Sequence, residues 1–263
     1  MSIASPEHLL HDLADQLWAA EQSATAIPPM TDPAPGLDIA GAYRVQLLNI
    51  QRKLDRGERV TGKKIGLTSV AMQELLGVRQ PDYGHLLASM EVIGGATDRA
   101  SLVQPRVEAE LAFILKSGLP TSGVTPEAVL AATGYVVPAL EIVDSRITDW
   151  KISLVDTVAD NASSGRYVLG THRIDPLAVD LREISMELSK NGSTVNSGQG
   201  SAVLGDPALA VAWLANAVGE YGVSLDAGEV VLSGAMAAMV AVEAGDTVTA
   251  RFDGFEEVSV RFT

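Results

Sequence analysis

The chain of 263 residues contains no cysteine, few aromatic residues and far fewer basic than acidic side chains. The absence of cysteine excludes disulfide scaffolds, thiolate metal sites and cysteine nucleophiles. Lys and Arg number 19 against 33 Asp and Glu, a formal net charge of −14. Such a surface repels phosphate backbones, so we expect no nucleic-acid partner. An anionic substrate would need a local cation, either a metal ion or a placed Lys or Arg.

Long hydrophobic runs are also missing. The most apolar tract, residues 230–242, is interrupted by Ser233 and Gly234 and is followed by Glu243. It falls short of the roughly 20 residues that a membrane span needs. Residues 1–21 carry acids and histidines and lack the positive start and apolar run of a secretory signal. We therefore expect a cytoplasmic protein with no membrane contact.

The first sixty residues have a helical pattern. Apolar residues recur at helical spacing in residues 6–18 and again in 38–56. Residues 28–35 between them hold four prolines and predict a loop. We accordingly divide the chain into a helical N-terminal region, 1–60, and a β-rich catalytic domain, 61–263.

The remainder is dominated by strand patterns that do not alternate regularly with helices. This favours an α+β fold with a mostly antiparallel or mixed sheet over a doubly wound fold. No glycine-rich loop follows a strand in a nucleotide-binding pattern, so we expect no nucleotide cofactor. Short helices are predicted at 69–76, 126–132 and 207–221, and strands at 60–68, 107–115, 135–143, 229–232, 239–242, 247–252 and 258–262.

A Glu-Ala-Glu segment is the strongest candidate for chemistry. On a strand, Glu108 and Glu110 point to one face, while Val107, Ala109 and Leu111 point to the other. On a helix the two glutamates would diverge by about 200°. Adjacent carboxylates repel each other and are costly to bury without a cation. A hard ion such as Mg²⁺ or Mn²⁺ removes that cost and prefers carboxylate oxygens.

A third acid, Glu141, lies within the apolar run 136–143. A charge in such a run either lies at a strand end or has a partner. The alternative is that the Glu-Ala-Glu segment lies on an edge strand, where charged residues form a solvated face that discourages aggregation.

Lys63 and Lys64 lie between Gly62 and Gly66, which would allow the backbone to approach a ligand. On a strand one lysine of the pair should point inward. An inward lysine can hold a substrate carboxylate, or exchange a proton if its pKa is lowered. The alternative is a surface turn with two solvated lysines.

Two further segments are polar. Residues 80–87 predict a turn in which Asp82 could act as a general base near a bound water, or could merely cap the turn. Residues 158–165 predict a loop whose hydroxyl and amide groups could line a pocket, or form an ordinary polar turn.

Taken in order, these segments resemble the 2-keto-4-pentenoate hydratase and 4-oxalocrotonate decarboxylase group of the fumarylacetoacetate hydrolase superfamily. The resemblance spans nearly the whole chain. Each piece is short, but their ordered set is specific. It rests on residues 42–46 (Ala-Tyr-Arg-Val-Gln), 64–69 (Lys-Ile-Gly-Leu-Thr-Ser), 81–84 (Pro-Asp-Tyr-Gly), 108–110 (Glu-Ala-Glu), 138–146 and 159–164.

The resemblance implies a β-rich mixed-sheet roll of the fumarylacetoacetate hydrolase C-terminal type, preceded by a helical part, in a homo-oligomer. It implies that Glu108, Glu110 and Glu141 ligate Mg²⁺ or Mn²⁺, and that Lys64 lies at the active site. The other expected substrate contacts are Asn161, Ser163, Leu76 and Ser233.

Within this group, hydratases carry an aspartate in the turn where decarboxylases tend to have an apolar residue, and this chain has Asp82. The resemblance thus implies a hydratase that adds water to a 2-hydroxy-2,4-dienoate, such as 2-hydroxypenta-2,4-dienoate, with the ion chelated by the C1 carboxylate and C2 oxygen. The alternatives are a 2-oxo-hexenedioate decarboxylase, a C–C hydrolase of acylpyruvates, and a non-catalytic partner subunit. A downstream aldolase or a decarboxylase is a possible associate.

Overall fold

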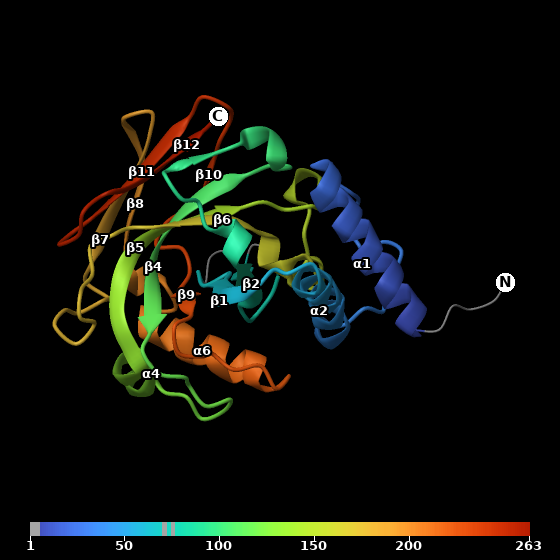
Figure 1. Ribbon diagram of the computed structural model, residues 1–263, viewed down its shortest axis with the longest axis horizontal. Helices are drawn as coiled ribbons and strands as arrows, with labels where there is room; N and C mark the ends of the chain where they lie inside the picture. Colours follow the sequence, from blue (N-terminus) through green and yellow to red (C-terminus); the bar gives the residue numbers. More distant parts are fainter. Residues whose placement is uncertain (1–5, 70–72, 75–76) are drawn as a thin grey trace.

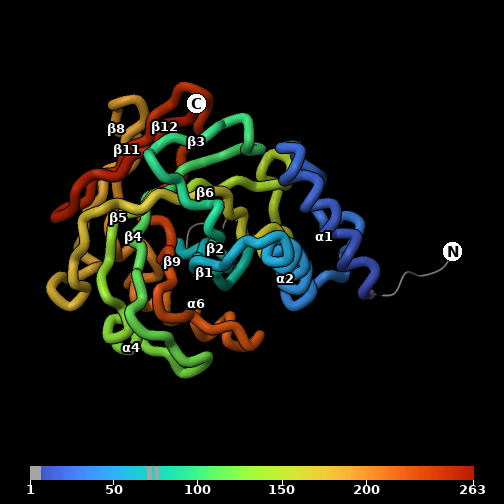
Figure 2. The backbone as a smooth tube through the Cα atoms, in the orientation of Figure 1, coloured from blue at the N-terminus to red at the C-terminus, as the bar shows by residue number. Residues whose placement is uncertain are grey.

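The computed structural model describes residues 6–69, 73–74 and 77–263 (Figure 1). Two helices, α1 (Pro6–Ser23) and α2 (Ile39–Asp55), lie on one side of the molecule. A small sheet that includes β8, β11 and β12 lies on the opposite side, and a larger curved sheet fills the space between (Figure 2). The sequence-based expectation of an α+β fold with mixed sheets is confirmed.

The larger sheet has seven strands in the order β2-β1-β9-β4-β5-β6, with β10 paired to β4. Its neighbours are antiparallel except β1 and β9, which run parallel. The strands are β1 (Val60–Gly66), β2 (Asp82–Leu87), β4 (Arg106–Leu115), β5 (Thr133–Val143), β6 (Ser164–Leu169), β9 (Val230–Leu232) and β10 (Val240–Ala241).

The smaller sheet has the order β3-β12-β11-β7-β8, antiparallel except for the β3–β12 pair. Its strands are β3 (Ala96–Thr97), β7 (Ser185–Lys190), β8 (Ser193–Gln199), β11 (Thr247–Phe252) and β12 (Val258–Phe262). The C-terminal strands were predicted, whereas β3, β6, β7 and β8 were not. β8, Ser-Thr-Val-Asn-Ser-Gly-Gln, has too few apolar residues for its alternation to be recognised.

The remaining helices are short and begin at side-chain caps. Thr125, Ser153 and Asp206 each accept a hydrogen bond from a backbone N–H in the first turn of the helix that follows. These helices are α4 (Pro126–Ala132), α5 (Leu154–Ala159) and α6 (Pro207–Gly219), with single 3-10 turns η1 (Ala88–Met90), η2 (Arg99–Ser101), η3 (Thr148–Trp150), η4 (Asn161–Ser163) and η5 (Gly200–Ala202). The helix predicted at 69–76 falls largely on residues outside those the structure describes.

One described stretch, Gly200–Gly219, has the length and apolar composition of a membrane span. It includes α6, and half of it is buried inside the molecule, where α6 contacts α4 and β1. A core helix of a globular protein has the same composition.

The two faces of the larger sheet are buried in different ways. On one face, Val107, Leu111 and Phe113 of β4 belong to the main hydrophobic cluster, which also contains the apolar face of the smaller sheet. On the other face, small residues such as Ala112 and Ala139 belong to a separate cluster with Tyr167, Leu86 and Leu87. The second face therefore has room for the polar side chains that it also carries.

Residues 80–87 were predicted as a turn, and this is wrong. Asp82–Leu87 form β2, which pairs antiparallel with β1 over six positions. Every residue of β2 is buried, because α5, the 3-10 turn at 161–163 and β6 pack against the strand, and Gln46 of α2 reaches it with its side chain. The prediction failed because Pro81 and Gly84 are typical of turns, and tertiary pairing overrides that preference here.

The N-terminal helices share the main hydrophobic cluster with the sheets, through Leu13, Leu17 and Tyr43 among others. Gln46 of α2 fixes this packing, because its side-chain amide donates to the carbonyls of Tyr83 (3.0 Å) and Val158 (2.6 Å). The boundary at residue 60 stays a prediction, and α2 in any case forms part of the wall behind β2.

Gln46 also fixes which ring nitrogen of His85 carries a proton. Its amide nitrogen is used on two carbonyls, so its oxygen accepts from Nδ1 of His85 at 2.9 Å. Burial, with a smaller contribution from the charge of Lys63, lowers the pKa of His85 from 6.5 to about 4. His85 is therefore held neutral inside the protein.

We predict that this neutral histidine makes the protein acid-sensitive. An unfolded His85 binds a proton near pH 6.5, whereas the folded one binds it only near pH 4, so stability is fully present above pH 6.5 and falls progressively between those values. The loss should reach up to about 3 kcal/mol. Urea unfolding of the wild type and of H85Q from pH 7.5 to 4 should show a shallower fall for the variant. H11Q, at an exposed position of α1, is the control and should follow the wild type; equal slopes for H85Q and wild type would contradict the prediction.

Candidate active site

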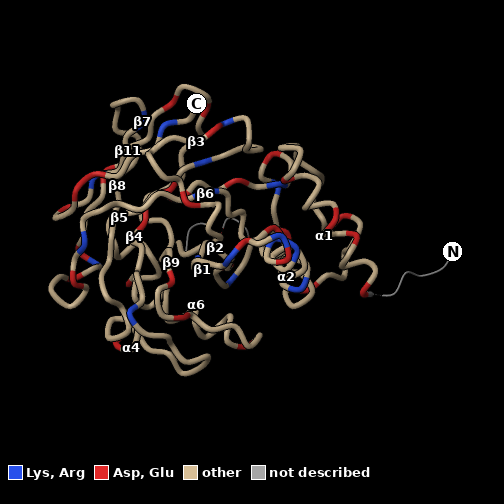
Figure 3. Tube along the Cα trace, viewed as in Figure 1, with Lys and Arg blue, Asp and Glu red and all other residues tan. Residues whose placement is uncertain are grey.

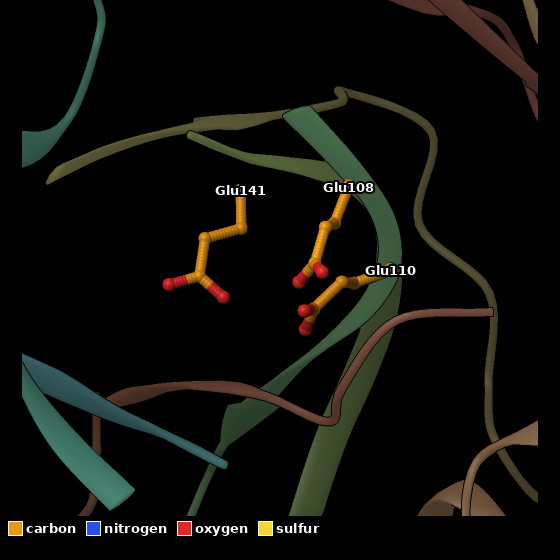
Figure 4. A group of neighbouring side chains, drawn as sticks. All are labelled: Glu108, Glu110 and Glu141. Atoms are coloured by element: carbon orange, nitrogen blue, oxygen red, sulfur yellow. The ribbon is translucent and has the colours of Figure 1, made fainter. Parts of the chain in front are cut away.

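Three glutamates converge on one face of the larger sheet. Glu108 of β4 lies directly opposite Glu141 of β5, and Glu110 lies two residues farther along β4, opposite Ala139. Residues paired across an antiparallel ladder, or two apart on one strand, share a face. One carboxyl oxygen from each glutamate lies within 4.8 Å of the others. Figure 4 shows Glu108 and Glu110 side by side, with Glu141 facing them.

β4 is not an edge strand, because β5 flanks it on one side and β9 and β10 on the other. Glu110 is fully buried and Glu141 is 1% exposed, while Glu108 is partly exposed. The alternative of a solvated edge face is therefore wrong. Glu108 is thus the most exposed of the three carboxylates.

The carboxyl oxygens have few donors among the described residues. Glu110 Oε2 accepts from the backbone N–H of Gly234 at 2.7 Å, but its Oε1 has no hydrogen-bond partner. Glu141 makes an ion pair at 3.1 Å between its Oε1 and Lys64 Nζ, and neither of its oxygens has a well-formed hydrogen bond. Burying carboxyl oxygens without hydrogen-bond donors costs free energy, and a cation bound at this point would offset that cost.

The electrostatics agree with this conclusion. Burial and then the charge of Glu141 raise the pKa of Glu108 to about 7. The same two causes raise the pKa of Glu110 well above its usual range, and burial raises that of Glu141 despite Lys64. A cation bound among the three would remove the mutual repulsion. Two oxygens bound to one Ca²⁺ can lie up to about 5 Å apart, which covers the 4.8 Å limit, whereas Mg²⁺ holds its oxygens at most about 4.2 Å apart and would draw the carboxylates closer together.

Both lysines of the Lys-Lys pair are buried, which excludes the surface-turn alternative. Lys63 is 4% exposed and forms an ion pair with Glu229 on the outer side of β1, and Lys64 is 2% exposed and points to the glutamates. Burial alone would lower the pKa of Lys64, but Glu141, with smaller effects from nearby acids, outweighs it and raises that pKa. Lys64 is thus a buried ammonium.

Asp82 lies on the same side as Lys64, since it pairs with Gly66 at the end of β1. A Cβ at position 66 would lie 2.3 Å from Asp82 Oδ1 and 3.3 Å from Lys64 Nζ, so only glycine leaves room for both groups. Oδ2 of Asp82 accepts from Thr157 Oγ1 at 2.6 Å, and its Oδ1 is buried with no hydrogen-bond partner in the part of the chain that the structure describes. One oxygen is anchored and the other is free to accept a proton.

The other predicted substrate contacts differ in whether their side chains are already hydrogen-bonded within the protein. The hydroxyls of Ser163 and Ser233 are buried without a hydrogen-bond partner among the described residues. The side chain of Asn161 instead binds β2: its Oδ1 accepts from the N–H of His85 (2.7 Å) and its Nδ2 donates to the carbonyl of His85 (2.9 Å). The substrate contact of Asn161 stays a prediction, and Leu76 lies outside the described residues.

Sequence reasoning missed two residues near the site. Thr157 carries no local signal, because its bond to Asp82 joins positions 75 residues apart. Arg106 could have been found, since it precedes Glu108 by two residues on β4 and so shares its face. Its guanidinium stacks on Trp150, 4.7 Å from the ring centroid, and its charge lowers the pKa of Glu108. It places a cation at the more exposed end of the site.

Arg106 and Lys64 bring positive charge to this site in a protein that is acidic overall. Acidic residues outnumber basic ones over the chain, and the two signs lie together on helices such as α2 (Figure 3). The site thus offers a buried ammonium, Lys64, and a partly exposed guanidinium, Arg106, to an anionic ligand.

The chain is similar to proteins of known activity. A family model for the fumarylacetoacetate (FAA) hydrolase C-terminal region matches residues 85–263. A 2-hydroxyhexa-2,4-dienoate hydratase of Comamonas testosteroni is 47% identical over 98% of this chain and 99% of its own. A 2-keto-4-pentenoate hydratase of Paraburkholderia xenovorans is 47% identical over 95% of this chain and 94% of its own. The structure of a 4-oxalocrotonate decarboxylase from Pseudomonas putida G7, complexed with magnesium and adipate, superposes with a TM-score of 0.94 at 38% identity and covers 99% of both chains.

We predict that Glu110→Gln stabilises the metal-free protein and abolishes stabilisation by metal. The substitution removes one of three repelling charges, and the amide oxygen can still accept from Gly234. The melting temperature of the metal-free variant at pH 8 should exceed that of the wild type, by an amount equivalent to about 1 kcal/mol or more. Millimolar MnCl₂ should raise the melting temperature of the wild type alone. Glu187→Gln, on β7 of the other sheet, is the control; an unchanged metal response in E110Q would refute the assignment.

Proposed function

The chain belongs to the fumarylacetoacetate hydrolase family, and on this basis we propose that it is a metal-dependent hydratase of 2-hydroxy-2,4-dienoates. The reaction adds water to 2-hydroxypenta-2,4-dienoate or a close homologue and gives a 4-hydroxy-2-oxo acid, as in the meta-cleavage catabolism of aromatic or steroid rings. The observation that carries the proposal is the convergence of three carboxylates, two of them buried, beside a buried lysine. The names of the relatives supply the substrate class.

Glu108, Glu110 and Glu141 would hold the divalent ion, because an oxygen of each converges on one point, and Glu110 Oε1 and both oxygens of Glu141 have no hydrogen-bond partner among the described residues. Such an ion supplies Lewis acidity, which favours the keto form of the substrate and stabilises enolate charge. Either Mg²⁺ or Mn²⁺ suits an all-carboxylate site. The ligand set is complete without a histidine or a thiolate, in keeping with the composition of the chain.

Lys64 holds the carboxylate of the substrate or exchanges a proton with the dienol. It is the buried cation closest to the glutamates in the described structure, through its 3.1 Å ion pair with Glu141. In an acidic molecule, a fixed ammonium at this depth orients an anionic substrate with its charged end inward.

Asp82 orients or deprotonates the water that adds to the diene. Thr157 fixes one of its oxygens, and Oδ1 remains available at the wall of the site. The unpartnered hydroxyls of Ser163 and Ser233 would donate hydrogen bonds to the substrate. Asn161 would contact the substrate as well, and its side chain also holds β2, and with it Asp82, in place.

A decarboxylase of a 2-oxo-hexenedioate is the second candidate, favoured by the TM-score of 0.94 with the decarboxylase structure. Asp82 favours the hydratase, as do the relatives at 47% identity. A C–C hydrolase would need a histidine to activate water, and the buried His85 is instead bonded to Gln46. A non-catalytic subunit has no need of three converging carboxylates.

We also infer a cytoplasmic homo-oligomer, by analogy with catabolic enzymes of this family. Exposed apolar side chains such as Ile93, 79% exposed, and Leu177, 67% exposed, suit subunit contacts. Association with a downstream aldolase or a decarboxylase belongs to the same proposal.

We predict that hydration requires the metal site. Loss of dienoate absorbance should be followed with Mg²⁺ or Mn²⁺, with EDTA, and with Glu108→Gln. EDTA should abolish turnover and metal should restore it, while E108Q should bind metal more weakly. Full activity in EDTA, or an inert E108Q that retains its metal, would count against the scheme. CO₂ release from the hexenedioate by the same protein, without hydration of the monoacid, would favour the decarboxylase instead.

We predict that Asp82→Asn separates the two chemical steps. The variant keeps the shape of Asp82 and its contact with Thr157, but the amide cannot take a proton from water. Hydration should fall by about 10²-fold or more, the usual contribution of a general base, while ketonisation of the dienol remains largely intact. Nuclear magnetic resonance of the products in D₂O measures both rates. Asp156→Asn at the cap of α5 is the control for altered packing, and an equal loss of both steps in D82N would refute the role.

A further inference from the structure

The turn that carries Ser163 has a backbone conformation that these residues rarely adopt. The φ angles of Asn161, Ala162 and Ser163 are 54°, 49° and 53°, and none of the three is glycine. The left-handed region brings Cβ close to a carbonyl oxygen, so it is normally visited by single residues. A run of three persists only where the surroundings hold it.

Arg146 holds both ends of this turn. Its guanidinium donates from Nε to Asp160 Oδ1 (2.5 Å) and from Nη2 to the Asp160 carbonyl, immediately before the turn. Its Nη1 donates to the carbonyl of Ser164 (2.8 Å), immediately after the turn. The backbone N–H of Arg146 donates to the second oxygen of Asp160 at 2.9 Å. The turn is thus clamped at its first and last flanking residues.

The clamp is tied in turn to β5 and β2. Arg146 Nη1 also donates to the carbonyl of Asp144 (2.5 Å), whose N–H donates to the carbonyl of Ser163 (2.7 Å). The side chain of Asn161 occupies the backbone groups of His85 on β2. A Cβ on Gly84 would lie 2.5 Å from the carbonyl of Asn161, so the turn and β2 are in direct contact.

The bonds between Arg146 and Asp160 do more than neutralise two buried charges. Arg146 is 5% exposed and Asp160 is 2% exposed, and such pairs contribute little net stability compared with apolar residues. Their specific effect here is to impose a conformation. The result of that conformation is a buried hydroxyl, Ser163 Oγ, with no hydrogen-bond partner among the described residues.

We propose that Arg146 is a positioning residue: it holds the left-handed turn 161–163 so that the hydroxyl of Ser163 is presented to the substrate. This inference rests on the proposed function of the site. The guanidinium donates hydrogen bonds to Asp160, Asp144 and Ser164, which flank or contact the turn. It therefore acts through Ser163 and not on the substrate. Lysine cannot replace it, because one ammonium on a flexible stem cannot span two ends of a turn.

The test compares R146K, S163A and the double variant with the dienoate substrate and saturating metal. We expect S163A and R146K each to lower kcat about tenfold or more, with KM changed less than threefold. The double variant should be within about twofold of S163A, since the clamp has nothing left to position. Losses that multiply would show that Arg146 acts independently of Ser163 and would overturn the proposal. An S163A with full activity would overturn it as well.

Glycine provides a rescue that a general stabilising effect would not imitate. Ala162→Gly removes the steric penalty of the left-handed conformation, so R146K/A162G should recover at least a third of the lost kcat. Ala24, with a φ of 47° after α1, is a matched position far from the site in sequence. R146K/A24G should recover nothing, and equal recovery from both glycines would contradict the proposal.

Hydrogen exchange tests the clamp without reference to activity. The N–H groups of Asp144 and Ser163 are bonded at the turn, and their exchange should be at least tenfold faster in R146K than in wild type. Unchanged exchange would overturn the proposal even if the protein proves not to be a hydratase. If R146K does not fold, D160N weakens the same clamp from its other side, and the same pattern is expected. A wild type that fails to hydrate dienoates, with exchange altered as expected, would refute the proposed function alone.

Discussion

Like-charge repulsion among three converging carboxylates, two of them buried, is the constraint around which this protein is built. Glu108, Glu110 and Glu141 are placed together by strand pairing, and no protein donor satisfies Glu110 Oε1 or either oxygen of Glu141 with a good hydrogen bond in the described structure. A single lysine compensates part of the charge. Under the proposed function a divalent ion would offset the remainder, and metal binding and folding stability would then be linked.

The sheet tolerates this arrangement because its two faces have separate tasks. The face that carries Val107, Leu111 and Phe113 packs against the main core and supplies the hydrophobic stabilisation. The other face uses small residues such as Ala112 and Ala139 beside the glutamates. Hydrophobic packing on one face of β4 thus supplies stability, and the polar side chains that are costly to bury lie on the other face.

The polar groups around the glutamates are each held by long-range bonds. Thr157 anchors Asp82, Gln46 anchors the strand that carries it, and Arg146 anchors the turn that carries Ser163. Rigid supports of this kind would hold the proposed catalytic groups in position before a substrate binds. They also explain why α2, far from the glutamates in sequence, belongs to the wall of the site.

The sequence by itself determined the strand at 107–115, the shared face of Glu108 and Glu110, and the isolated charge of Glu141 in an apolar run. These follow from a period of two and from the cost of burying charge, both of which are local. The ordered motifs added the family. They also pointed to Lys64 rather than Lys63. Tertiary structure alone decided that Glu141 pairs with Glu108 and that residues 82–87 form a strand. It also decided the bonds of Thr157 and Arg146. Those outcomes depend on register and on contacts between distant segments, which no local pattern encodes.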